Sequence, residues 1–326
     1  MSQRDRGVVV SFMTEDWREP TLRPLSGGYS GETFVAETAG ELSVVRIYAR
    51  NPARAAIDAS LLRLVRGLVP VPEVLELRHP TAESPGVLVT EYVDADPLDR
   101  LLASQEAASL DLEAVGHSVA GVLTSLSGVP FLRFGGFVDA ELGVVTWDTG
   151  DDLADWGRRH QTSGRLAGWT PGQRDGLNGL LSDAQQLVDD AERLRPARPV
   201  LTHSDLNPKN LLVDRQSGAV AAVLDWEFAH AGSMHADLGN FCRFERDPRL
   251  VEPLVADVAA ARGIGPGEQL RLGRASDLWA LVELAARPVP NPVSLLAETL
   301  LLAQAGSGDL DAWPWPDPRV EPRLLG

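Results

Sequence analysis

Residues 201–210, LTHSDLNPKN, contain a His, an Asp, two Asn and the only Lys of the chain, and apolar runs flank them. Phosphoryl transfer needs residues of these types. A carboxylate must lie near the acceptor hydroxyl, oxygen ligands must hold Mg²⁺, and cations or backbone N–H groups must hold the phosphates. His203, Asp205 and Asn210 form the pattern H-x-D-x-x-x-x-N, and Asp225 ends an apolar run twenty residues after Asp205.

Two short apolar runs connect these residues. NLLVD at 210–214 and AAVLD at 221–225 are separated by the turn-rich stretch RQSG, which predicts a β-hairpin. Asn210 begins the first run and Asp225 ends the second. Both therefore lie at one end of the predicted hairpin, and we expect Asp205, Asn210 and Asp225 to come together there.

These motifs resemble those of the aminoglycoside phosphotransferase family, within the protein-kinase-like superfamily. The protein-kinase catalytic loop reads H-R-D-x-x-x-x-N and is followed by a metal-binding D-F-G, where this chain has HSDLNPKN and LDWEFA. The resemblance implies that Asp205 is the catalytic base and that Asn210 and Asp225 bind Mg²⁺. It also implies that His203 and, within HADLGN, Asp237 support the loop.

The resemblance covers about residues 20 to 290, and its N-terminal part implies a nucleotide site. LSGGYSGETF is similar to the phosphate-covering loop of kinase folds, although it departs from G-x-G-x-x-G, and it implies phosphate contacts at Ser26, Gly27 and Gly28. Arg46 takes the place of the usual phosphate-binding lysine, and Asp58 that of its glutamate partner. A guanidinium still binds phosphate and carboxylate in a forked geometry, so an Arg46–Asp58 pair is expected.

The stretch VLVTEYVDADPL resembles the hinge between kinase lobes. The backbone at Glu91, Tyr92 and Val93 would then hydrogen-bond a nucleotide base. Side chains there do not separate ATP from GTP. Lys209 lies inside the catalytic loop, where it can contact the γ-phosphate or point outward.

The acceptor is predicted to be a small cationic molecule. Only eleven residues separate Asp225 from Asp237, too few for the activation segment of a protein kinase. The net charge of −16 favours cationic partners and disfavours nucleic acids. Glu227 is one candidate for binding the acceptor. The stretch 146–160 alternates acidic residues with tryptophan, and from it we select Asp148, Asp152 and Trp156 as further candidates. The alternative for this stretch is a solvated helix with its Trp in the core.

The elements that position these residues predict an α+β, bilobal protein-kinase-like fold. Residues 1–94 have the pattern of a small antiparallel sheet with one helix at 53–67, and form the predicted nucleotide-binding lobe. Residues 95–326 form the predicted catalytic and substrate-binding lobe. This part is mostly helical, because apolar residues recur every three to four positions at 97–127, 174–195, 248–262, 267–286 and 293–305.

Several protein classes are excluded by composition. The chain has 326 residues and one cysteine, Cys242, so it cannot form an internal disulfide. It lacks an apolar run of eighteen residues, and MSQRDRG is unlike a secretory signal. We therefore expect a cytoplasmic monomer or dimer with no membrane partner.

Three functions remain open. The first is a kinase for a cationic antibiotic, either an aminoglycoside or a basic cyclic peptide, since HSDLNPKNLLV and AVLDWEFA also look similar to viomycin- and capreomycin-type kinases. The second is a metabolite kinase acting on choline, an amino sugar or homoserine. The third is a pseudokinase that binds nucleotide without turnover, which Arg46 suggests and which Asp205, Asn210 and Asp225 oppose.

Overall fold

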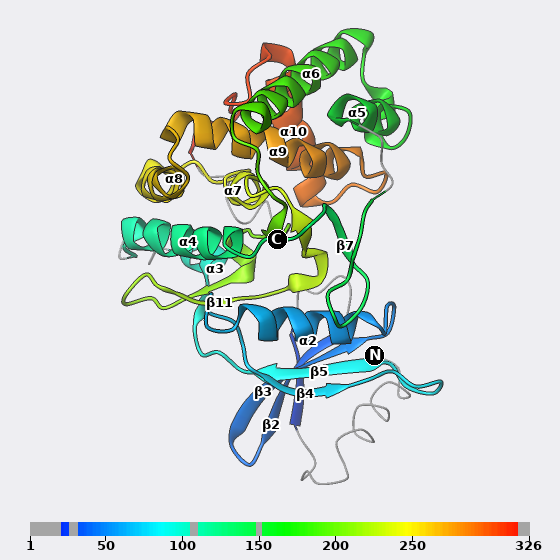
Figure 1. Ribbon diagram of the computed structural model, residues 1–326, viewed down its shortest axis with the longest axis vertical. Coiled ribbons are helices and arrows are strands. Elements are labelled where there is room, and N and C mark those ends of the chain that lie inside the picture. Colours follow the sequence, from blue (N-terminus) through cyan, green and yellow to red (C-terminus); the bar gives the residue numbers. More distant parts are fainter. Residues whose placement is uncertain (1–20, 26–31, 105–109, 148–151, 319–326) are drawn as a thin grey trace. The chain divides into compact units, whose positions relative to one another are not determined.

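The computed structural model describes residues 21–25, 32–104, 110–147 and 152–318. The chain divides into two compact units (Figure 1). The first contains the described residues up to Asp94, together with Phe137–Val144 and Ala222–Glu227, and the second contains the remainder. Two later stretches of the chain therefore belong to the N-terminal unit.

The first unit contains a five-stranded antiparallel sheet with the strand order β1-β2-β3-β5-β4. Its elements are β1 (Thr21–Pro24), β2 (Glu32–Thr38), β3 (Glu41–Tyr48), α2 (Arg54–Val65), β4 (Val74–Arg78) and β5 (Gly86–Glu91). The strands alternate so that one face carries a buried cluster, which includes Phe34, Val45, Ile47, Val87 and Val89. The predicted sheet and helix of this part are confirmed.

Helix α2 packs on this sheet (Figure 1). Gly86, the first residue of β5, makes the close approach possible. A Cβ atom at Gly86 would lie 2.4 Å from the carbonyl oxygen of Pro52 and 3.0 Å from the Cβ of Ala55. The sequence therefore needs glycine here to bring the start of the helix against the strand.

The second unit is mostly helical. Its helices are α3 (Leu98–Ala103), α4 (Leu112–Ser127), α5 (Leu153–Gln161), α6 (Pro171–Leu194), α7 (Ala236–Phe241), α8 (Pro248–Arg262), α9 (Pro266–Ala286) and α10 (Pro292–Ser307), with 3₁₀ turns η2 (Arg165–Gly168) and η3 (Pro208–Asn210). Four of the five predicted helical stretches are confirmed nearly to their ends. The fifth, at 97–127, contains α3 and α4 as separate helices.

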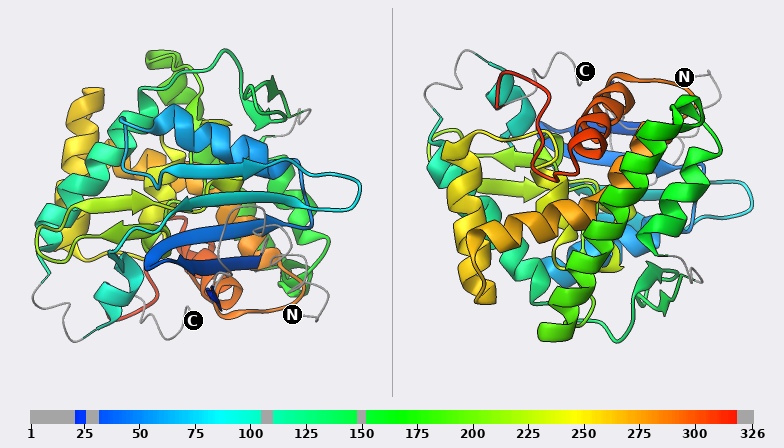
Figure 2. Two further views of the ribbon diagram at one scale, coloured as in Figure 1. Left: turned by 90° about the horizontal axis from the view of Figure 1, so that it is seen from below. Right: turned by 90° about the horizontal axis from the view of Figure 1, so that it is seen from above.

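Figure 2 shows α6, in green, running beside α9 and α10, in orange and red. Their shared core contains Leu177, Leu181, Leu278, Leu281 and Leu300. Local signals set where these helices begin. Thr170 and Gln173 form a capping box before α6, and Asn291 and Ser294 form another before α10, so backbone N–H groups at both starts are satisfied.

Short strands connect the helices. Strand β9 (Val200–Thr202) pairs with β12 (His230–Gly232), which pairs in turn with β7 (Gly135–Phe137), and β7 neighbours β8 (Val144–Val145). Strand β10 (Leu211–Val213) lies between β6 (Asp96–Pro97) and β11 (Val220–Val223). The Asp214 N–H donates to the Ala219 carbonyl at 2.9 Å and closes the turn, so the predicted hairpin is confirmed. Strands β7, β8 and β11 and the 3₁₀ turn η4 (Trp226–Phe228) cross the boundary between the units.

Within the described residues, no helix is both long and apolar enough to span a lipid bilayer. The composition of the two units, an antiparallel sheet with one helix and a mainly helical unit, agrees with the predicted α+β class.

A close contact between α7 and α9 yields a stability prediction. A Cβ atom at Gly239 would lie 2.0 Å from the Gly273 carbonyl oxygen, whereas the exposed Gly179 on α6 has nothing within 4 Å. We expect Gly239→Ala to lower the free energy of unfolding by about 1–3 kcal/mol through overpacking. Gly179→Ala should raise it by up to about 1 kcal/mol, because alanine favours helix.

Urea unfolding followed by circular dichroism measures both changes. Equal effects of the two substitutions would contradict the proposed backbone contact.

Candidate active site

The predicted catalytic loop lies in the second unit, between β9 and β10. Strand β9 ends at Thr202, and the loop then runs through His203 to η3. Asp237, on α7, accepts the backbone N–H groups of His203 at 2.8 Å and Ser204 at 2.7 Å. Both His203 and Asp237 are buried. A carboxylate from a distant part of the chain therefore fixes the start of the loop.

The backbone at Ser204 is held in an unfavourable conformation. Its φ is 68°, in the left-handed region that residues other than glycine seldom adopt. Such a residue persists only where its surroundings impose the conformation, and the Asp237 carboxylate provides this constraint. Burial raises the pKa of Asp237, while His203 and the two N–H donors act in the opposite direction.

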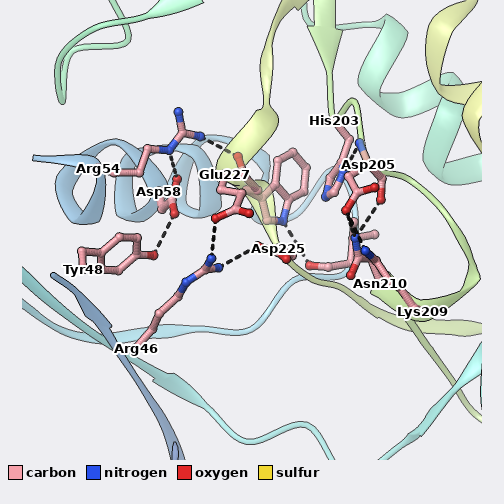
Figure 3. A network of polar contacts seen from close by, with 12 residues as sticks. Arg46, Tyr48, Arg54, Asp58, His203, Asp205, Lys209, Asn210, Asp225 and Glu227 are labelled. Atoms are coloured by element: carbon pink, nitrogen blue, oxygen red, sulfur yellow. Dashed lines mark hydrogen bonds and ion pairs between the residues drawn. The ribbon is translucent and has the colours of Figure 1, made fainter. Parts of the chain in front are cut away.

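The carboxylate of Asp205 is held by three neighbours (Figure 3). The side-chain amide of Asn207 donates to Oδ1 at 2.7 Å, and that of Asn210 donates to Oδ2 at 2.9 Å. Lys209 Nζ lies 3.2 Å from Oδ2. The Asp205 N–H also donates to His203 Nδ1 at 3.3 Å. The loop therefore presents one oriented carboxylate, with 19% of its side chain exposed.

Asn210 and Asp225 fit the chemistry of a magnesium site. The amide nitrogen of Asn210 is used on Asp205, which leaves its oxygen as the atom that can bind a hard cation. In the first unit, Asp225 Oδ1 accepts from Arg46 and Oδ2 remains available. Both residues thus offer an oxygen of the type that Mg²⁺ prefers.

Arg46, on β3 of the first unit, donates to two acids beyond β11 (Figure 3). Its Nη1 lies 2.8 Å from Asp225 Oδ1, and its Nη2 lies 2.7 Å from Glu227 Oε2. Burial alone would lower the pKa of Arg46, but the charges of Tyr48, Asp225 and Glu227 outweigh it and raise this pKa above its ordinary value. The forked guanidinium can satisfy both carboxylates at once, which an ammonium group does less well.

The predicted Arg46–Asp58 pairing needs correction. Asp58 accepts hydrogen bonds from Tyr48 Oη at 2.7 Å and from Arg54 Nε at 2.6 Å. Arg54 also donates to the carbonyl of Trp226. Arg54 lies one turn before Asp58 on α2. It is therefore Arg54 that pairs with the Asp58 carboxylate, where the prediction had Arg46. Burial raises the pKa of Asp58, and Arg54 and Tyr48 oppose that rise.

Sequence reasoning missed Tyr48 and Arg54. The i,i+4 spacing of Arg54 and Asp58 is the signal that could have indicated their pairing. It also missed the buried pair between Arg243 Nε and Asp277 Oδ2, at 2.7 Å, which joins the residues after α7 to α9. No local sequence signal links those two residues.

Asp225, like Ser204, has a left-handed backbone conformation. Its φ is 63°, again in the left-handed region. The residue follows β11 directly after Leu224, and the Val223 N–H donates to the Pro70 carbonyl at 2.9 Å, which fixes the end of the strand within the first unit. Strained backbone at non-glycine residues is concentrated at functional sites in proteins.

The predicted hinge is only partly suited to a nucleotide base. The Glu91 N–H donates to the Glu73 carbonyl at 2.9 Å, so a base contact at Glu91 would have to use its carbonyl oxygen. The Glu91 carboxylate accepts the Glu73 N–H at 3.2 Å. Tyr92 and Val93 follow β5 and are half-buried. Ser26, Gly27 and Gly28 lie outside the described residues.

The predicted acceptor ligands are engaged in other contacts. Glu227 pairs with Arg46, and Asp152 accepts the Asp155 N–H at 2.8 Å as the N-cap of α5. Trp156 packs against the core of the second unit, donates to the Trp279 carbonyl at 2.9 Å and has the Arg159 guanidinium 5.4 Å from its ring. The core alternative is therefore the one observed for Trp156. Asp148 lies outside the described residues.

Trp147, from the same stretch, remains accessible. Half of its surface is exposed, and its ring lies 4.7 Å from that of His230, between centroids. It is therefore the tryptophan of this stretch that can present an aromatic face to a ligand.

The Arg46 network predicts a stability difference. Arg46→Met keeps the length of the side chain but leaves Asp225 and Glu227 without the guanidinium, so we expect the free energy of unfolding to fall by about 1–3 kcal/mol. Arg23→Met, in the exposed Arg23–Glu37 pair of the same sheet, should change it by less than about 0.5 kcal/mol.

Thermal and urea unfolding of both variants measure this difference. A loss for Arg46→Met no larger than for Arg23→Met would show that the network contributes nothing to stability.

Comparison with solved structures supports the fold. In fold, the chain resembles a thermostable mutant of aminoglycoside phosphotransferase APH(4)-Ia in a ternary complex with AMP-PNP and hygromycin B, at 19% identity and a TM-score of 0.63, over 92% of this chain and 97% of that one. It also resembles the GDP complex of aminoglycoside 2'-phosphotransferase-IIIa, at 14% identity and a TM-score of 0.63, over 93% and 98%. These likenesses confirm the predicted protein-kinase-like fold class.

No protein with a curated description matches the chain. The profile of the phosphotransferase enzyme family (APH) matches residues 21–272. This match spans most of the chain, including β9, the loop from His203 to Asn210, and α7. The predicted resemblance is confirmed: the chain belongs to the phosphotransferase enzyme family.

Proposed function

We propose that this chain is a small-molecule kinase that transfers the γ-phosphate of ATP or GTP to a hydroxyl group of a cationic acceptor. The observation that carries this proposal is the geometry at Asp205. Its carboxylate is oriented by Asn207, Asn210 and Lys209 in a loop that Asp237 braces. A positioned carboxylate of this kind can orient an acceptor hydroxyl and accept its proton during transfer.

The contacts to the phosphate end of the nucleotide are proposed from the resemblance of the motifs. Asn210 and Asp225 are proposed to hold Mg²⁺, which would offset the negative charge of the phosphates. Arg46 is proposed to bind phosphate in place of lysine, since a guanidinium forms forked hydrogen bonds with phosphate oxygens as it does with carboxylates. It lies beside Asp225, so it would have to share that carboxylate with the metal.

The donor is proposed to be a purine nucleoside triphosphate. The structures similar in fold contain AMP-PNP in one case and GDP in another, which supports nucleotide use without selecting ATP or GTP. The backbone of Tyr92 and Val93, with the Glu91 carbonyl, is proposed to contact the base. Ser26, Gly27 and Gly28 are proposed to cover the phosphates. On this proposal, residues 1–94 form the nucleotide-binding lobe and residues 95–326 the catalytic lobe.

The acceptor is proposed to be an aminoglycoside or a basic cyclic peptide. The net charge of −16 attracts polycations, and one structure of similar fold contains hygromycin B. Trp147 can offer an aromatic face to an ammonium group. The rival acceptors are metabolites such as choline, an amino sugar or homoserine, which share the cationic group but are smaller.

Asp205→Asn tests the proposed base. The substitution keeps the shape of the side chain but cannot accept the proton, so kcat should fall by a factor of about 10² to 10⁴. The KM for nucleotide should change little. Asp175→Asn, an exposed acid on α6, serves as the matched control and should keep the wild-type rate.

The assay measures phosphorylated product by mass spectrometry with ATP and with GTP, over aminoglycosides, basic cyclic peptides and the rival metabolites. Wild-type turnover in Asp205→Asn would refute its assignment as the base. Turnover of metabolites alone would favour the rival kinase, and binding of Mg²⁺-nucleotide without turnover of any acceptor would favour a pseudokinase.

Asp225→Asn tests the proposed metal ligand. Removal of its negative charge should raise the Mg²⁺ concentration needed for half-maximal rate by roughly tenfold, because a hard cation prefers a carboxylate to an amide. Glu37→Gln, which removes an exposed acid of β2, should leave this concentration unchanged. A Mg²⁺ dependence of Asp225→Asn equal to that of the wild type would exclude Asp225 as a ligand.

A further inference from the structure

A cavity of about 400 Å³ lies within the second unit. It is bordered by the C-terminal end of α6, the connection from β12 to α7, and the end of α8. This volume is in the range of pockets that bind small molecules. Three arginines, together with apolar groups, line it: Arg195, Arg198, Arg262, Phe134, Val188 and Ile264.

Arg262 contributes a positive charge, and its hydrogen-bond partners are neutral groups. Its Nη1 donates to His235 Nδ1 at 3.2 Å and to Gln269 Oε1 at 3.0 Å, and its Nη2 donates to the Met234 carbonyl. Because a guanidinium only donates hydrogen bonds, His235 Nδ1 must be the acceptor. These hydrogen bonds therefore bring Arg262 no counter-charge.

The charges of these two groups at neutral pH follow from their surroundings. Burial, reinforced by Arg262 and Arg195, lowers the pKa of His235 to about 3, so its ring is neutral. Burial lowers the pKa of Arg262 to about 10, and Asp237 opposes this fall. Arg262 therefore remains protonated at neutral pH although it is half-buried.

The rim of the cavity has a further positive charge. Among the described residues, Arg198 has no hydrogen-bond or ion-pair partner, whereas Arg195 is paired with Glu268. The one acid in the lining is Glu192. The lining therefore carries three arginines and one acid, on a protein whose net charge is −16, and the buried Asp237, outside the lining, also acts on Arg262.

We propose that this cavity binds a small organic anion with an apolar body, its carboxylate, phosphate or sulfonate group lying between Arg198 and Arg262. Phe134, Val188 and Ile264 would contact the apolar body. Binding here involves none of the residues proposed for transfer and does not depend on the proposed function.

The cavity adjoins the brace of the catalytic loop. Ser233, Met234 and His235 line it, and Asp237 follows two residues later on the same chain. The Ser233 carbonyl accepts from Thr202 Oγ1 at 3.3 Å, one residue before His203. A ligand in the cavity would therefore contact the segment that carries the loop's support.

Fluorescence titration with anilinonaphthalene sulfonate tests the proposal, with uncharged N-phenylnaphthylamine as the matched probe. The intact protein should bind the sulfonate more tightly than the uncharged probe. Arg198→Gln and Arg262→Gln should each weaken sulfonate binding by roughly tenfold, the size of one charge-assisted hydrogen bond. Ala261→Phe, which adds a large side chain to the lining and keeps its charges, should weaken the binding of both probes.

Arg63→Gln, on the exposed face of α2, removes a positive charge elsewhere and should leave the titration unchanged. If Arg262→Gln does not fold, as judged by circular dichroism, Arg198→Gln and Ala261→Phe decide the outcome. Equal affinity for the two probes, or sulfonate binding that Arg198→Gln and Ala261→Phe leave unchanged, would overturn the proposal.

Discussion

The buried carboxylate of Asp237 is the constraint on which the proposed catalytic loop depends. It accepts two successive backbone N–H groups, at His203 and Ser204, and so holds Ser204 in a left-handed conformation that its side chain disfavours. With the backbone fixed there, His203 is buried and its Nδ1 accepts the Asp205 N–H. The orientation of the Asp205 carboxylate is thus a consequence of a residue thirty-two positions later in the sequence.

A second constraint operates in the first unit at Arg46, which has the position that the motif resemblance gives to a phosphate-binding lysine. Lysine provides a compact charge, whereas the planar guanidinium donates in two directions and joins Asp225 to Glu227. The replacement thus retains a cation beside the proposed metal ligand and adds a second acidic partner. The acid on α2, Asp58, is in turn hydrogen-bonded by Arg54 and Tyr48, so the local charges remain paired.

The sequence predicted the elements well, because apolar periodicity and capping residues act locally. Apolar periodicity indicated α6, α8, α9 and α10, and two apolar runs around a turn indicated the hairpin that follows Asn210, whereas the short helix α7 was not among the periodic stretches. Side-chain partners were predicted less well, because they depend on which groups compete for one carboxylate. Asp58 was assigned to Arg46, although Arg54 on the same helix lies nearer in sequence. Trp156 was predicted to contact the acceptor, with a core position as the alternative, and its half-buried ring packs against the core of the second unit. Nor did any local signal indicate that residues 137–144 and 222–227 belong to the first unit.

We propose that Asp205 receives the acceptor hydroxyl while Asn210 and Asp225 hold the metal. A crystal structure of the complex with Mg²⁺, AMP-PNP and an acceptor that the enzyme phosphorylates would test this arrangement. We expect an acceptor hydroxyl within hydrogen-bonding distance of an Asp205 carboxylate oxygen and a metal bound to both Asn210 and Asp225. A reactive hydroxyl bound away from Asp205, or a metal that contacts neither residue, would contradict it.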